Sequence, residues 1–250
     1  MLEPMTPRWA GLLLGMLAAA TAGACAGGPP TVDPSGVDGL VVPTPSPRPA
    51  DFTDRIDNPW FPLVPGTVRT YRLTTAQGTR TLTAAVTGRT RLVAGVRTVV
   101  VHEAVTGPRG RRLAQADNWY AQDRAGNVWS FGTAGSSYDG GRPDAGGSWQ
   151  AGVDGAEAGL AMPAQPRLGD GYAREHAPGV AEDRAEVLDL AAPRDVAAGA
   201  YHRLLETADS SPLEPGRVQH TFYARGVGLV EQDTVTGGTE RLELTGVRSP

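Results

Sequence analysis

Glycine and proline interrupt this chain at short intervals, and that punctuation limits what it can fold into. The chain holds 33 glycines and 21 prolines. Between them lie short runs rich in threonine, valine, tyrosine and leucine, such as TVRTYRLTT at 67–75, TRTLTAAVT at 79–87 and VRTVVVHEAVT at 96–106. Residues of this kind favour strands, and their near alternation in hydropathy is typical of strands with one buried face. The pattern therefore predicts short antiparallel strands.

The rest of the chain extends this pattern. WYAQDRAGNVWSFG at 119–132 is typical of a hairpin whose turn lies at 124–127, and the runs at 218–224, 228–235 and 239–247 resemble further strands. We predict a mainly β fold with little helix: a single curved antiparallel sheet, open like a half barrel. The segment 180–192 leaves strand and short helix open, although its neighbours favour a strand, and 199–208 has the same ambiguity. The stretch around 132–171 predicts a long irregular loop region.

Residues 1–24 have the layout of a signal peptide. A leader with Arg8 precedes the apolar run WAGLLLGMLAAA at 9–20, and small residues follow it. An apolar run of about 12 residues is too short to cross roughly 30 Å of hydrocarbon as a permanent helix. We therefore expect a removable export signal.

The single cysteine, Cys25, directly follows this segment. The preceding AGA at 22–24 fits an ordinary signal-peptidase site, and it also resembles the lipobox of bacterial lipoproteins, in which the cysteine after the cut carries a diacylglycerol. A lone thiol in an oxidising compartment has no disulfide partner, and acylation would remove that reactive group. Residues 25–50 then read as a lipidated cysteine and a Pro/Gly-rich disordered tether, which leaves 51–250 as a single β-rich domain.

Composition excludes several functional classes. All 23 basic residues are arginine, and without lysine there is no Walker-A loop, no Schiff-base enzyme and no Ser-x-x-Lys site. The net charge is −4, and the sequence contains no stripe of clustered basic residues, so nucleic acid is not an expected partner.

A family resemblance rests on four motifs: NPWFPLVPGTVRTY (58–71), WYAQDRAGNVWSFG (119–132), GSWQAGVDGAEAGLAMPAQPRLGDGY (147–172) and YARGVGLVEQ (223–232). Together they resemble a family of uncharacterised exported proteins of actinobacteria, whose activity is unassigned. The Pro-Leu-x-Pro-Gly corner before a strand is also similar to the curved sheets of lipoprotein-carrier-like proteins. That second resemblance implies a sheet able to cup a hydrophobic ligand, and fold alone does not fix function.

Aromatic residues gather in three segments, which allows two interpretations. They can be core and cross-strand packing residues, or they can wall an apolar ligand cleft. The cleft would be lined by Trp60, Phe61, Trp119, Tyr120, Trp129, Phe131 and Trp149.

Metal and acid–base chemistry has weak candidates. His102, His176 and His220 lie near acidic residues, but adjacent strand residues point to opposite faces, and no His-Glu-x-x-His motif occurs. We expect no catalytic residue, no metal and no cofactor, and so no enzyme.

These features predict an envelope lipoprotein on the outer face of the cytoplasmic membrane, anchored through Cys25. Its partners would be the membrane, through the lipid anchor, and a lipophilic small molecule or another envelope component, which the non-enzymatic body would bind. Two alternatives stay open: a scaffold that presents the 132–171 loop to a protein partner, and an exported metal-dependent hydrolase.

Overall fold

The computed structural model describes residues 7–10, 13–16, 48–139, 142–144 and 146–250, so Cys25 and the predicted tether up to residue 47 lie outside the described residues. Within the described part, the elements are almost all strands, as predicted. They are β1 (Pro7–Ala10), β2 (Leu13–Met16), η1 (Pro49–Asp51, a 3-10 turn), β3 (Phe52–Thr53), β4 (Val68–Thr75), β5 (Gly78–Val93), β6 (Val96–Thr106), η2 (Pro108–Gly110, a 3-10 turn), β7 (Arg112–Asp123), β8 (Val128–Asp139), β9 (Arg142–Asp144), β10 (Trp149–Gln150), β11 (Gly159–Met162), β12 (Gly171–Ala173), β13 (Arg184–Val196), β14 (Gly199–Ser210), β15 (Val218–Ala224), β16 (Gly228–Thr236) and β17 (Arg241–Arg248).

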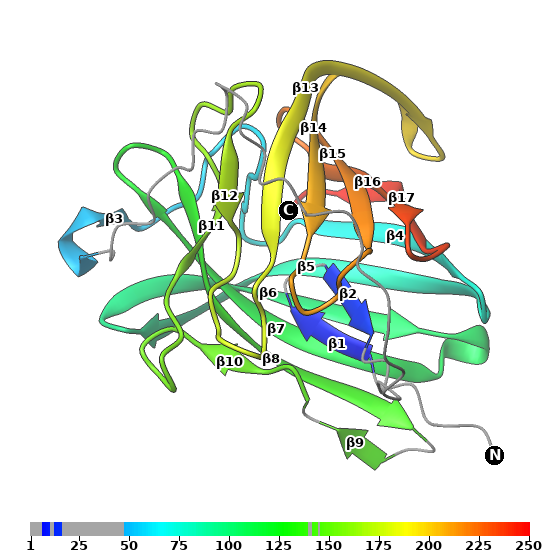
Figure 1. Ribbon diagram of the computed structural model, residues 1–250, viewed down its shortest axis with the longest axis horizontal. Helices are drawn as coiled ribbons and strands as arrows, with labels where there is room; N and C mark the ends of the chain where they lie inside the picture. Colours follow the sequence, from blue (N-terminus) through cyan, green and yellow to red (C-terminus); the bar gives the residue numbers. More distant parts are fainter. Residues whose placement is uncertain (1–6, 11–12, 17–47, 140–141, 145) are drawn as a thin grey trace, which may run out of the picture.

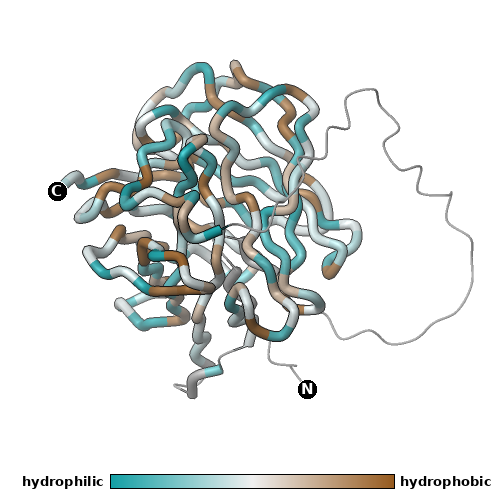
Figure 2. The backbone as a smooth tube through the Cα atoms, turned by 90° about the vertical axis from the view of Figure 1, so that its left-hand side faces the viewer, coloured by the Kyte–Doolittle hydropathy of each residue, from teal (hydrophilic) through white to brown (hydrophobic). Residues whose placement is uncertain are grey.

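One large antiparallel sheet organises the molecule (Figure 1). Its main path runs β10-β8-β7-β6-β5-β4-β17-β16-β15-β14-β13-β12, and β3, β9 and β11 pair beside it, while β1 and β2 pair separately. In Figure 1 the yellow and orange strands β13 and β14 cross the teal and green strands β5–β8. The sheet does not close on itself, which confirms the predicted open, curved architecture. Hydrophilic and hydrophobic residues alternate along the strands in Figure 2, as strand geometry requires.

Both ambiguous segments are strands. The segment 180–192 contributes to β13, and 199–208 lies within β14, its hairpin partner. The hairpin predicted at 119–132 is present, with β7 and β8 joined by the turn at 124–127.

The region around 132–171 contains more strand than its composition indicates. The run GTAGSSYD continues β8 to Asp139, because it pairs with β7 from Thr133↔Asn118 to Ser137↔Ala114. Tertiary pairing outweighs the low strand propensity of glycine and serine here. After Gly147, the chain forms only the short strands β10, β11 and β12, separated by turns.

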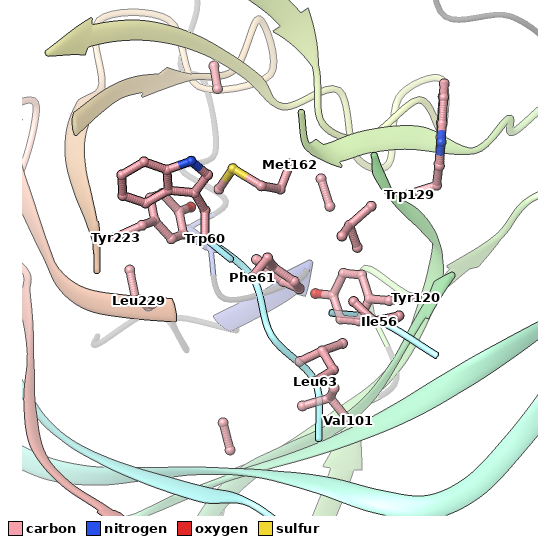
Figure 3. Close-up of a cluster of buried hydrophobic side chains, with 14 of the residues drawn as sticks. Ile56, Trp60, Phe61, Leu63, Val101, Tyr120, Trp129, Met162, Tyr223 and Leu229 are labelled. Carbon is pink, nitrogen blue, oxygen red and sulfur yellow. The ribbon is translucent and has the colours of Figure 1, made fainter. Parts of the chain in front are cut away.

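The chain's own segment 56–63 fills the interior of the sheet. Ile56, Trp60, Phe61 and Leu63 are all buried there, and Figure 3 shows them among side chains of both halves of the sheet, including Tyr120 and Tyr223. Burial of such side chains supplies the main favourable term in folding.

Two side chains hold this segment in place. The Oε1 atom of Gln122 accepts the backbone N–H groups of Asp57 and Asn58 at 2.9 and 2.8 Å, and the Asn58 amide donates to the carbonyls of Gly126 and Pro163. A cavity of about 30 Å³ remains beside Phe61 and Tyr120. It is large enough for water but not for a lipid chain.

Candidate functional site

The two ends of the sheet approach each other along a line that we call the seam, where residues 149–162 face residues 172–183. The backbone N–H of Glu157 donates to the carbonyl of His176 at 2.8 Å, in an isolated antiparallel bridge. The approach is close: a Cβ atom on Gly159 would lie 2.2 Å from the carbonyl oxygen of Arg174. The open sheet is thus bridged rather than closed by a continuous ladder.

A pocket of about 310 Å³ lies at one end of this seam, and we call it the seam pocket. Among the described residues that line it, Asp154 alone carries a charge, and the remainder are aromatic, aliphatic or neutral polar side chains. The lining consists of Trp119, Thr133, Ala134, Ser148, Trp149, Gln150, Val153, Asp154, Ala156, Ala177, Pro178 and Val180.

Two tryptophans from neighbouring strands form part of this lining. Trp119 of β7 pairs with Gly132 of β8, and Trp149 of β10 pairs with Thr133. Gly132 has φ +133°, and a Cβ atom there would lie 2.3 Å from the Trp149 carbonyl oxygen. Glycine at this position therefore lets the backbone of β10 approach β8 closely. The register sets Trp149 in the row of Thr133 and Trp119 in the next row, and both residues line the pocket.

Arg91 joins the β5–β6 hairpin to the pocket wall. Its guanidinium lies 4.0 Å from the centroid of the Trp119 ring, a cation–π contact, and its Nη2 donates to Gln150 Oε1 at 2.8 Å. Sequence analysis did not single out Arg91, because an arginine in an exposed strand position is usually only solvated.

Two neutral polar side chains in the cross-strand row of Trp149 lack hydrogen-bond partners among the described residues. Asn118 and Thr133 are cross-strand neighbours, and each is 1% exposed. Within the described part of the chain, neither amide atom of Asn118 nor the hydroxyl of Thr133 makes a hydrogen bond. Burying such groups unpaired costs about 1–3 kcal/mol each, so their presence beside a pocket is notable.

Glu175 provides a buried carboxyl at the seam. Burial raises the pKa of Glu175 well above its ordinary value of 4.5, and the nearby Asp183 carboxylate raises it further. The Trp149 indole N–H faces the same carboxyl and lowers its pKa, although the contact falls short of full hydrogen-bond geometry. Glu175 therefore favours its protonated form, with Asp183 as its hydrogen-bond partner.

The preceding residue, Arg174, belongs to a different polar cluster. Its Nη1 lies 2.9 Å from Asp209 Oδ2, and both side chains are buried. Asp209 also accepts the hydroxyls of Thr207 at 2.9 Å and Thr221 at 2.5 Å. Burial also raises the pKa of the neighbouring Tyr223 hydroxyl to about 12. Every oxygen of this carboxylate is bonded, so the arrangement serves the fold.

The seven predicted cleft residues are all buried, but the structure brings only two of them, Trp119 and Trp149, to the seam pocket. Phe61 and Tyr120 meet edge to face at 5.2 Å and line the small interior cavity. The remaining three pack elsewhere: Trp60 under the guanidinium of Arg225, Trp129 with its indole N–H on Asp123 Oδ2, and Phe131 edge to face with Phe52.

The weak metal candidates each face a single carboxylate. His102 Nδ1 lies 2.7 Å from Asp117, His220 Nδ1 lies 2.8 Å from Glu206, and His176 Nδ1 lies 4.0 Å from Glu157. No group of three or more potential metal ligands forms among the described residues. In the same part of the chain, no helix is long and apolar enough to cross a membrane.

Comparisons with known proteins give the fold a context. No family model and no curated protein matches the chain. It is similar to a Bacteroides fragilis protein assigned as exported with a YmcC-like fold, at 16% identity and a TM-score of 0.46, over 76% of this chain and 99% of that one. It is also similar to a Parabacteroides distasonis protein assigned as a lipoprotein, at 13% identity and a TM-score of 0.41, over 78% and 100%. Neither comes from an actinobacterium, so they do not support that part of the resemblance. At these values neither likeness assigns a function.

Proposed function

We propose that this chain is an exported envelope lipoprotein, anchored to the membrane through a lipid on Cys25, and that its β-rich body binds a small, mainly apolar molecule in the seam pocket. The body acts by binding rather than by catalysis. The observation that carries the binding proposal is the seam pocket itself, with Trp119 and Trp149 in its wall.

The size and lining of the pocket support an apolar ligand. Its volume of about 310 Å³ is at the lower end of the usual range for small-molecule sites, roughly 300–1,000 Å³. Such sites combine apolar and aromatic walls with a few polar groups that fix orientation. Here Trp119, Trp149 and Val153 supply apolar surface, and Thr133 and Gln150 supply neutral polar groups.

The alternative of a loop presented to a protein partner has less support. The stretch 149–162 contributes many side chains to the core, among them Trp149, Ala151, Leu160 and Met162. A segment whose side chains are used internally is a poor candidate for a freely presented loop. We therefore favour ligand binding at the seam over the scaffold hypothesis.

A pocket-filling variant tests the binding proposal. Ala134 lines the pocket and is exposed on β8, so Ala134→Trp fills the space without disturbing the core. We expect the neutral apolar dye N-phenyl-1-naphthylamine to bind the wild-type chain with a fluorescence increase, and the variant to bind it at least about tenfold more weakly. Val235→Trp, at an exposed β16 position outside the pocket lining, is the matched control and should bind as the wild type does. A wild-type chain that ignores the dye, or equal binding by both tryptophan variants, would refute the pocket as a site.

The anchor is tested separately. We expect the mature chain isolated from the envelope to begin at Cys25 and to carry the mass of a diacylglycerol on it, whereas Cys25→Ser should move the protein from the membrane fraction to the soluble fraction. The move to the soluble fraction is expected because the two acyl chains of the diacylglycerol are what hold the protein stably on the membrane. An unmodified Cys25, or a Cys25→Ser protein that still fractionates with the membrane, would contradict the anchor.

A further inference from the structure

The predicted tether enters the folded body beside the end of one long hairpin. Pro49 of η1 packs on the turn between β5 and β6: a Cβ atom on Gly95 would lie 3.0 Å from Pro49 Cγ. We call residues 89–97 the hairpin tip. Because the chain leads from Cys25 to Arg48, an anchor at Cys25 attaches to the body at this end.

The hairpin tip combines an exposed apolar side chain with arginines. Leu92 is 72% exposed, the highest value among the large apolar residues of the described chain. Arg97 stands directly opposite it on β6, and both Arg97 and Arg91 are exposed and make no ion pair with described residues. The turn residues Ala94 and Gly95 have φ of 47° and 79°, a two-residue hairpin turn that matches strand twist and presents Leu92 on an ordered support.

The acidic groups around the tip do not cancel its charge. Asp51 pairs with Arg48 at 2.9 Å, and Asp117 pairs with Arg89 at 3.0 Å. Asp154 lies in the adjacent turn, which reaches the tip through the contact of Gly152 with Ala94. That turn also carries Val153, which is 46% exposed. Arg97, together with Arg91 in its contacts with Trp119 and Gln150, thus outnumbers the one remaining acid, beside two exposed apolar side chains.

We propose that the hairpin tip, with Val153 beside it, docks on the surface of an anionic lipid bilayer. Leu92 enters the interfacial region, and Arg97, its cross-strand neighbour on the same face, contacts lipid phosphates. This is the combination by which peripheral proteins bind anionic membranes. The anchored orientation rests on the proposed function, since the tether brings this end to the membrane. It also turns the seam pocket toward the bilayer, because Val153 and Asp154 line that pocket. An apolar ligand then passes between membrane and pocket without crossing water.

Binding to vesicles tests the docking surface without the lipid anchor. The protein is the chain from residue 25 onward with Cys25→Ser, and the vesicles contain phosphatidylcholine with or without phosphatidylglycerol. We expect cosedimentation with the anionic vesicles at low salt, weakened by added salt. Arg97→Gln should weaken binding about fivefold, the effect of one arginine near an anionic surface. Leu92→Ser should weaken it about tenfold, as expected when a leucine no longer leaves water.

The matched control lies at the opposite end of the same strand. Arg109 and Arg111 are exposed beside η2, and the 11 residues of β6 place them about 33 Å from the tip. This distance exceeds the Debye length of about 10 Å at 0.1 M salt, so Arg109→Gln with Arg111→Gln should leave binding nearly unchanged. A control variant that weakens binding as much as Arg97→Gln would overturn the proposal in favour of a net-charge effect.

The two proposals fail in different ways. An unlipidated chain that ignores anionic vesicles overturns docking, whatever the mass of the wild-type Cys25. Vesicle binding that depends on Leu92 and Arg97 supports docking, even if Cys25 proves unmodified and the anchor falls.

Discussion

Arg174 and Glu175 are consecutive buried ionisable residues with opposite surroundings. Arg174 has a carboxylate, Asp209, at 2.9 Å, and that carboxylate is completed by Thr207 and Thr221. Glu175 faces another carboxylate, Asp183, and an indole that does not reach full hydrogen-bond geometry. One position is matched in charge, and the next is mismatched.

The two residues differ in how completely the seam satisfies them. A buried ion pair that is fully hydrogen-bonded fixes the geometry around it, whereas an imperfectly satisfied polar group costs free energy. Arg174, which directly follows β12, connects the end of that strand to β14 through Asp209. Glu175 faces Trp149, whose side chain lines the seam pocket, and the bonding between the two is incomplete.

Removal of one partner of the matched pair should have the largest effect. Asp209→Ala leaves the Arg174 guanidinium buried without a counter-charge, so we expect the free energy of unfolding to fall by about 3–5 kcal/mol. Urea denaturation measures it. Arg72→Ala breaks the more exposed pair with Glu243 and should cost less than about 1 kcal/mol. If both variants lose the same free energy of unfolding, the buried Arg174–Asp209 pair contributes no more than an exposed pair, and the contrast with Glu175 fails.

The backbone approach at the seam predicts an intermediate effect. Gly159→Ala places a methyl group 2.2 Å from the Arg174 carbonyl oxygen. One of the two backbones must then move, which displaces the bridge between Glu157 and His176. We expect a loss of about 1–3 kcal/mol, typical of overpacking. Gly171→Ala is the control, since a Cβ atom there meets nothing within 4 Å. A Gly159→Ala chain as stable as this control would mean that the seam is loose.

The fold was largely predictable because its signals are local. Strand periodicity and glycine and proline turns identified most strands of the sheet, including β7 and β8 with their hairpin turn. The extension of β8 through GTAGSSYD was not predictable, since it depends on the partner strand β7 rather than on the segment's own residues.

The seam pocket could be predicted only in part. Trp119 and Trp149 were identified as possible cleft residues from their aromatic character. That both line one pocket depends on which strand edges approach across the sheet, and a single sequence carries no signal for that. Arg91 carried no signal in the sequence, and Glu175 counted only as the acidic neighbour of His176 in a weak metal or acid–base candidate. Only the folded geometry puts Arg91 over an indole and buries Glu175.

The mismatched carboxyl predicts the smallest effect, and one that depends on pH. Because the folded state raises the pKa of Glu175 above 4.5, the unfolded chain loses this proton first as pH rises. The contribution of Glu175 to stability is therefore fully present below pH 4.5 and declines above it, up to the pKa of the folded state. Glu175→Gln removes the titration and keeps a donor for Asp183. The variant should therefore be more stable than the wild type near neutral pH, because the wild-type carboxyl is ionised in the unfolded chain and resists ionisation in the folded one. Urea denaturation of both proteins from pH 4 to pH 8 measures the difference, which should widen as pH rises. A difference that stays constant across this range would show that Glu175 is as well matched as Arg174, and the contrast between the two residues would disappear.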